Sequence, residues 1–170
     1  MDVKEALTIS IDYEHKVRDH YAAGAAVILD TQGRKVFETL AKEEQGHVAY
    51  LESRLEEWLK TGKIADAELP TVLPSREFIE EARRRVSGAP ADTLAVRGEL
   101  ELLKVALELE RKTGAFYREL VETLPAEHRE LFARFLVIEE GHLAIVQAEI
   151  DALAGHGHWF DFMEFQLEAG

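Results

Sequence analysis

Apolar residues recur at steps of three and four along four long segments of the chain, which is the spacing of one face of an α-helix. The segments cover about 2–29, 34–60, 92–122 and 125–154. No stretch alternates apolar and polar residues over a useful length, so no sheet is expected. The pattern therefore predicts an all-α protein.

Turn-forming residues and prolines separate these segments. Asp30-Thr31-Gln32-Gly33 predicts a turn between the first two helices. Ser75 is a candidate N-cap for a short amphipathic helix at about 75–86, which Ser87-Gly88-Ala89-Pro90 would end. Pro125 suits the first turn of the last long helix, and Gly155-His156-Gly157-His158 would end that helix.

We expect a single four-helix bundle with a long crossover that contains the short helix. The chain has 170 residues, which is enough for one domain with a substantial core. The predicted parts are a first helix hairpin at 1–60, a crossover at 61–91, a second hairpin at 92–154 and an aromatic-rich tail at 155–170. A connection of this length can cross the bundle from one end to the other.

Each of the four apolar stripes is interrupted near its centre by ionisable residues. Two helices contribute a single glutamate, and the other two contribute a Glu-x-x-His pair whose members share a helix face. If the four stripes face one another, four carboxylates and two imidazoles meet in one core layer. These residues are Glu14, Glu44, His47, Glu110, Glu139 and His142.

Such a layer needs positive charge. Burying an unpaired carboxylate costs several kcal/mol, and neighbouring carboxylates add to that cost. No Lys or Arg occupies a matching stripe position. Two divalent cations would balance four carboxylates, and a set of oxygen and imidazole ligands suits iron or manganese and tolerates zinc.

The two halves of the chain repeat the same pattern. Glu14 and Tyr21 have the spacing of Glu110 and Tyr117, and each half continues with a Glu-x-x-His pair. The repeat favours Glu44 over its neighbour Glu43 as the ligand, because the counterpart of Glu43 is the apolar residue Ile138. A single Glu-x-x-His would carry little information, but the doubled set is the pattern of ferritin-like carboxylate proteins with two metals.

Several residues allow a plainer interpretation. Tyr21 and Tyr117 either pack in the core or donate a hydrogen bond to a ligating carboxylate, with a radical-scavenging role as a further option. Glu44 and Glu139 would lie on a solvated face if the stripes were misassigned. His156 and His158 could bind a metal, but a helix-terminal role is the better interpretation.

Composition narrows the function classes. The net charge of −13 opposes binding to nucleic acid or to anionic lipid. With no cysteine, disulfides, thiolate zinc sites and cysteine-ligated iron–sulfur clusters are excluded. The chain start lacks a signal-peptide pattern and no apolar run approaches a membrane span, so we expect a cytoplasmic protein.

The chain resembles rubrerythrin and its ferritin-like relatives over nearly its whole length. The resemblance rests on the six candidate ligands above, with Tyr21 and Tyr117 beside them. It implies a carboxylate-bridged di-iron centre, in which Glu44 and Glu139 bridge both metals and the other four ligands are terminal. It further implies a non-haem di-iron oxidoreductase that reduces hydrogen peroxide or oxygen, and a homodimer.

Two departures from rubrerythrin matter for function. Rubrerythrins usually carry a cysteine-ligated rubredoxin domain, so the electron donor here would be a separate protein. They commonly have an additional carboxylate one turn after the third-helix glutamate, but that position is Thr113, and its repeat counterpart is Val17. The resulting symmetric site favours ferroxidase or general oxidase chemistry. Iron storage and a non-catalytic helical interaction module remain as alternatives.

Overall fold

The computed structural model describes residues 1–65, 68–86, 88 and 92–163. This part of the chain is helical and contains no strand, which confirms the predicted all-α class. The helices are α1 (Val3–Val27), α2 (Thr31–Thr61), α3 (Arg76–Arg83), α4 (Leu94–Thr123) and α5 (Ala126–His156).

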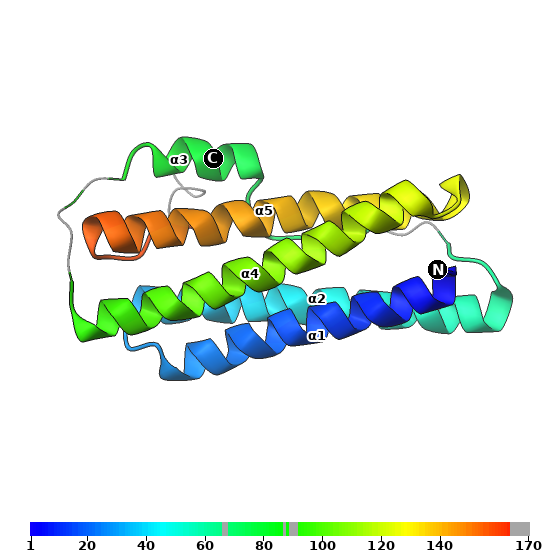
Figure 1. Cartoon of the computed structure of the whole chain (residues 1–170), viewed down its shortest axis with the longest axis horizontal. Helices are drawn as coiled ribbons and strands as arrows, with labels where there is room; N and C mark the ends of the chain where they lie inside the picture. The colour runs from blue at the N-terminus through cyan, green and yellow to red at the C-terminus, as the bar shows by residue number, and fades with distance from the viewer. Residues whose placement is uncertain (66–67, 87, 89–91, 164–170) are drawn as a thin grey trace.

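The four long helices pack as two antiparallel hairpins, α1 with α2 and α4 with α5 (Figure 1). The hairpins meet where α1 packs against α4, and α3 lies against the outer side of α5. Helix α2 ends at the opposite end of the bundle from the point where α4 begins. No helix in the described ranges is both long and apolar enough to cross a membrane.

Helix starts follow the expected capping chemistry, with one difference at α2. Ser75 caps α3 by accepting a hydrogen bond from the Phe78 amide, as predicted. The turn predicted over 30–33 is wrong, because Asp30 is the N-cap of α2 and the helix begins at Thr31. Asp30 Oδ1 accepts a hydrogen bond from the Gly33 amide at 2.9 Å, so Gly33 lies inside the first helical turn.

Gly33 allows the tail to pack closely against α2. A Cβ at this position would lie 2.2 Å from a ring atom of Trp159. The glycine therefore marks a close contact with a residue far away in the sequence, and it does not mark a turn.

Helix ends differ from the predictions by a few residues. Helix α5 continues to His156, two residues beyond the expected end, because Gly157 adopts the left-handed conformation (φ 72°) that closes the helix. Pro125 is the residue before the first turn of α5, not part of that turn. Helix α3 is shorter than its predicted range and ends at Arg83. Of the predicted breaker Ser87-Gly88-Ala89-Pro90, only Gly88 is described.

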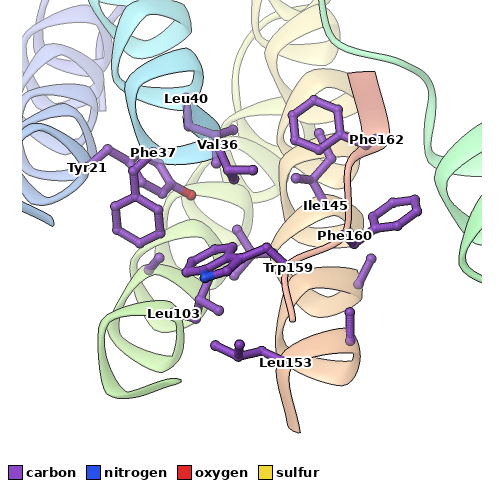
Figure 2. Packing of buried hydrophobic residues seen from close by; sticks show 14 of the residues in the cluster. Tyr21, Val36, Phe37, Leu40, Leu103, Ile145, Leu153, Trp159, Phe160 and Phe162 are labelled. Atoms are coloured by element: carbon purple, nitrogen blue, oxygen red, sulfur yellow. The ribbon is translucent and has the colours of Figure 1, made fainter. Parts of the chain in front are cut away.

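Two apolar clusters fill the bundle. One, drawn in part in Figure 2, includes Tyr21, Phe37 and Ile145, and the other includes Leu7 and Phe132. On every long helix, the candidate ligands lie in sequence between residues of the first cluster and residues of the second. The ionisable layer is therefore placed between two apolar regions.

The tail packs on its own bundle as far as residue 163. Trp159, Phe160 and Phe162 are buried in the first cluster (Figure 2). The Trp159 indole donates to Glu99 Oε2 at 2.9 Å, and the Phe160 amide donates to Glu149 Oε2 at 2.8 Å. The predicted tail residues 164–170 lie outside the described part of the chain.

Candidate metal centre

All six candidate ligands are buried, although four of them are carboxylates. None has a side chain more than 1% exposed, so the alternative of a solvated helix face for Glu44 and Glu139 is wrong. Because the residues sit in the apolar stripes of α1, α2, α4 and α5, packing of the helices brings them into one layer.

Glu44 lies at the middle of this layer. Its Oε2 is 3.0 Å from His47 Nδ1, and its Oε1 is 2.8 Å from His142 Nδ1. The imidazoles of His47 and His142 stack with their centroids 5.4 Å apart and their planes within 7°. Glu44 therefore directs one carboxylate oxygen at each imidazole.

The remaining carboxylates gather around the same two imidazoles. Glu14 Oε2 is 3.2 Å from His47 Nδ1, whereas Glu110 Oε2 and Glu139 Oε1 are 3.7 and 3.9 Å from His142 Nδ1. Two groups offer ligand atoms within 4.8 Å of one another, and Glu44 belongs to both. They are Glu14, Glu44, His47 and Glu139 in the first group, and Glu44, Glu110 and His142 in the second.

Several polar atoms of the layer have no protein partner. Both oxygens of Glu139, Oε2 of Glu110 and Nε2 of both imidazoles are buried without a hydrogen bond from the described residues. An unsatisfied buried acceptor carries its full desolvation cost, about 1–3 kcal/mol and more when charged. The carboxylate and imidazole donor set matches hard or borderline divalent cations. These buried clusters could therefore hold a metal ion.

Burial and neighbouring charges together shift the pKa values of the layer. Burial, with the Glu44 charge next, raises the pKa of Glu14 to about 8. Burial also raises the pKa of Glu139 well above its ordinary value, with Glu14 and Glu110 contributing.

The pKa values of Glu44 and of both imidazoles shift in the direction opposite to the one that burial alone would produce. Burial alone would raise the pKa of Glu44, but His142 and His47 overcome it and hold the pKa well below the ordinary value. Burial likewise opposes the charged form of His47, but Glu44 and Glu14 raise the His47 pKa to about 10. The layer holds protons that an incoming cation must displace, so metal binding would release protons.

The two tyrosines make crossed hydrogen bonds between the hairpins. Tyr21 on α1 donates to Glu110 Oε1 on α4 at 2.5 Å, and Tyr117 on α4 donates to Glu14 Oε1 on α1. Both side chains are fully buried, and burial followed by the neighbouring carboxylate charge raises their pKa well above the ordinary value. Both phenols therefore stay protonated and orient the carboxylates they contact.

Glu43 lies beside the layer in a role that the sequence did not indicate. Its carboxylate accepts hydrogen bonds from Thr71 Oγ1 at 2.7 Å and from the Val72 amide at 3.1 Å, which ties the crossover to α2. A Glu43 oxygen also lies within 4.8 Å of ring nitrogens of His47 and His142. The only sequence signal was that Glu43 shares a helix face with His47.

A cavity connects the crossover with the layer. It has a volume of about 430 Å³ and lies between the segment from Thr71 to Glu77 and the side of α5 that carries Val137, Ile138 and Gly141. His142 forms part of its wall. Small molecules could therefore approach the layer from the α3 side of α5.

The two histidines at the end of α5 contact backbone carbonyls. His156 Nδ1 lies 3.2 Å from the Gly88 carbonyl, and His158 Nδ1 lies 2.9 Å from the His156 carbonyl. No group of three metal-ligating side chains in the described ranges includes either of them. Sequence reasoning also missed Glu99 and Glu149, which are buried and hold the tail.

Comparisons with known proteins give a fold relationship alone. No protein-family model matches the chain, and no curated protein matches it. A solved structure of a hypothetical protein from Pyrococcus furiosus is similar to this chain, with a TM-score of 0.59 and 21% identity, and the match covers 90% of each chain.

Proposed function

We propose that this chain is a ferritin-like protein of the rubrerythrin type that holds two iron ions in the buried layer. The observation that carries the proposal is the doubled set of one glutamate and one Glu-x-x-His per hairpin, fully buried, with Glu44 shared between its two halves. Four carboxylates balance two divalent cations. Within the described ranges, these carboxylates form ion pairs with histidine and with no Lys or Arg. Manganese or zinc would accept the same ligands.

The proposed ligand roles follow the geometry. Glu44 and Glu139 would each serve both metals. Glu44 contacts both imidazoles, and Glu139 belongs to the first ligand group and lies 3.9 Å from His142 Nδ1. Glu14 and His47 would hold one metal ion, and Glu110 and His142 would hold the other. The donor set is symmetric, as the internal repeat requires.

We propose an oxidoreductase that reduces hydrogen peroxide or oxygen, with electrons from a separate donor protein. The bound iron pair would supply the one-electron steps between its ferrous and ferric states. Tyr21 and Tyr117 orient the terminal carboxylates and hold a proton at each phenol oxygen. The cavity beside His142 admits a small oxidant, while the two apolar clusters keep bulk water from the layer. A homodimer in the cytoplasm is the expected form.

A ferroxidase with a storage role is the second candidate, and Thr113 favours it. Thr113 is buried, and its hydroxyl donates a hydrogen bond to the Leu109 carbonyl at 3.0 Å. A threonine at this position supplies no additional carboxylate. A symmetric six-ligand site is closer to the bacterioferritin type. The mass of the assembly separates the two proposals, since storage requires a large shell and a dimer argues against it.

Anaerobic loading with ferrous iron tests the proposal. The wild type should bind close to two iron ions per chain, and the double variant Glu139→Ala/His142→Ala should bind fewer. Peroxide and oxygen are then added separately to the loaded protein. Faster oxidation by peroxide supports the peroxidase, and faster oxidation by oxygen supports the ferroxidase. A folded wild type that takes up no more metal than the double variant refutes both and leaves a non-catalytic helical module.

A further inference from the structure

A second cavity, of about 320 Å³, lies between α3, α4 and α5 and carries an unusual charge. Four arginines line it, together with only two glutamates, in a chain whose net charge is −13. Two arginines come from α3 and two from α4, and each pair is separated by two helical turns, so both members share a face. The four are Arg76, Arg83, Arg111 and Arg118.

One end of the cavity is neutralised by its own glutamates. Arg76 Nε donates to Glu80 Oε1 at 2.9 Å, and Arg118 lies 3.5 Å from Glu140 Oε1. The Glu140 charge also acts on Arg76, which places these residues near one another. This end has no surplus of positive charge.

The other end keeps one guanidinium group that has no partner among the described residues. The side chain of Arg111 makes no hydrogen bond or ion pair with any residue that the structure describes. Arg83 pairs at 2.7 Å with Asp151, which is not part of the cavity wall, and its side chain remains 47% exposed. Gln147 adds an amide to the same wall.

Apolar side chains form the rest of the wall. They come from all three helices and are Ile79, Leu107, Leu143 and Ala144. A cavity with an apolar wall and a few directed polar groups is the usual form of a small-molecule site. Its volume lies at the lower end of the range for such sites.

We propose that this cavity binds an organic anion that has a carboxylate or phosphate head and a short apolar body. Arginine presents a planar fork of donors that matches either head. Arg111 offers an unpaired fork, and Arg83 keeps the donors that Asp151 does not use. Elsewhere the acidic surface repels anions, so a local surplus of guanidinium groups selects this place. The apolar body packs on Ile79, Leu107 and Leu143.

The site stands beside the proposed metal centre but does not depend on it. The cavity shares Arg76, Glu80 and Glu140 with the cavity that reaches His142, so the two adjoin along α5. Figure 1 shows α3 lying along α5, and residues of both helices line both cavities. An anion held here would lie next to the route by which small molecules approach the layer.

Calorimetric titration of the full-length, metal-free protein at low salt tests this site. The probes are octanoate and octyl phosphate, with octanol and acetate as controls that lack either the head or the body. At least one amphiphilic anion should bind saturably at one per chain, about tenfold or more tighter than both controls. Preference for octanoate identifies a carboxylate head, and preference for octyl phosphate identifies a phosphate head.

Substitution of Arg111 provides the decisive comparison. Arg111→Gln should weaken binding of the preferred anion by about tenfold or more, since a charge-assisted contact is lost. Lys112→Gln is the matched control, because Lys112 is the next residue of α4 and lies outside the cavity wall. The proposal is overturned if no anion binds saturably, if octanol binds as well as the preferred anion, or if the two variants behave alike. Because the protein carries no metal in this test, failure here leaves the iron proposal untouched.

Discussion

Glu149 offers a sharp test of the energetics of the bundle, because it is a buried acid outside the metal layer. Its side chain is fully buried on α5, where Oε2 accepts the Phe160 amide at 2.8 Å. Oε1 has no partner among the described residues. Burial raises its pKa well above the ordinary value, and the charges of Asp161 and Asp30 add to that shift. We predict that Glu149→Gln stabilises the protein at neutral and alkaline pH.

The sign follows from proton linkage. The folded state keeps the Glu149 proton to higher pH than the unfolded state, whose glutamate ionises near pH 4.5. Wild-type stability is therefore lost as the pH rises from about 4.5 towards the folded-state pKa. Each unit between the two pKa values costs about 1.4 kcal/mol. Glutamine has no proton to lose, and its amide oxygen can still accept the Phe160 amide.

The size of the stability change depends on the hydrogen bonds that the buried Glu149 carboxylate lacks. One hydrogen bond leaves most of its solvation unreplaced, and an unsatisfied buried group costs about 1–3 kcal/mol, more when charged. We expect Glu149→Gln to raise the free energy of unfolding by about 1–3 kcal/mol at pH 8. The gain should vanish below pH 4.5.

Urea denaturation of metal-free protein between pH 4 and pH 8 measures this difference. The carboxylates of the buried layer cancel when the variant is compared with the wild type, because Glu149 lies about 15 Å along α5 from Glu139. Glu122→Gln, at an exposed position of α4, is the control and should show no pH-dependent gain. A Glu149→Gln effect that stays constant over this pH range, or a variant less stable than wild type at pH 8, would refute the reasoning.

Three further predictions concern the tail, the crossed hydrogen bonds and the metal. Gly33→Ala should destabilise the protein by about 1–3 kcal/mol and shift Trp159 fluorescence to the red, because the new Cβ displaces the indole. Gly98→Ala is the control and should not destabilise the protein, because nothing lies within 4 Å of a Cβ at that position. Tyr117→Phe should lower metal affinity about tenfold in competition titrations, since Glu14 loses its donor; unchanged affinity would contradict that positioning role. Divalent metal at 100 times its dissociation constant should add about 2.7 kcal/mol per site to unfolding in urea, reversed by chelator and absent in the double ligand variant.

The sequence was most informative where it repeats. A glutamate in an apolar stripe is ambiguous by itself, but two hairpins with the same spacing predicted that Glu14, Glu44, Glu110 and Glu139 point inward, and all four are buried. Helix periodicity predicted the all-α class for the same reason. Both inferences rest on local spacing, which a single sequence displays directly.

Long-range contacts could not be predicted in this way. Gly33 was interpreted as a turn residue. Its small size is required by the indole of Trp159, and this contact with the far end of the chain has no local sequence signal. Glu99 and Glu149 lack repeat partners, so nothing local distinguished them from exposed glutamates. Glu43 was set aside as a ligand, and its contacts with Thr71 and Val72 depend on where the crossover runs.

The crossed tyrosine bonds make neither hairpin self-sufficient. Tyr21 serves the glutamate of α4, and Tyr117 serves the glutamate of α1. A lone hairpin would retain its acids without their phenolic donors, whereas two identical hairpins in a symmetric pair would supply every such donor to each other. The phenolic support of Glu14 and Glu110 therefore exists only when both hairpins are docked, and separating them removes both donors at once.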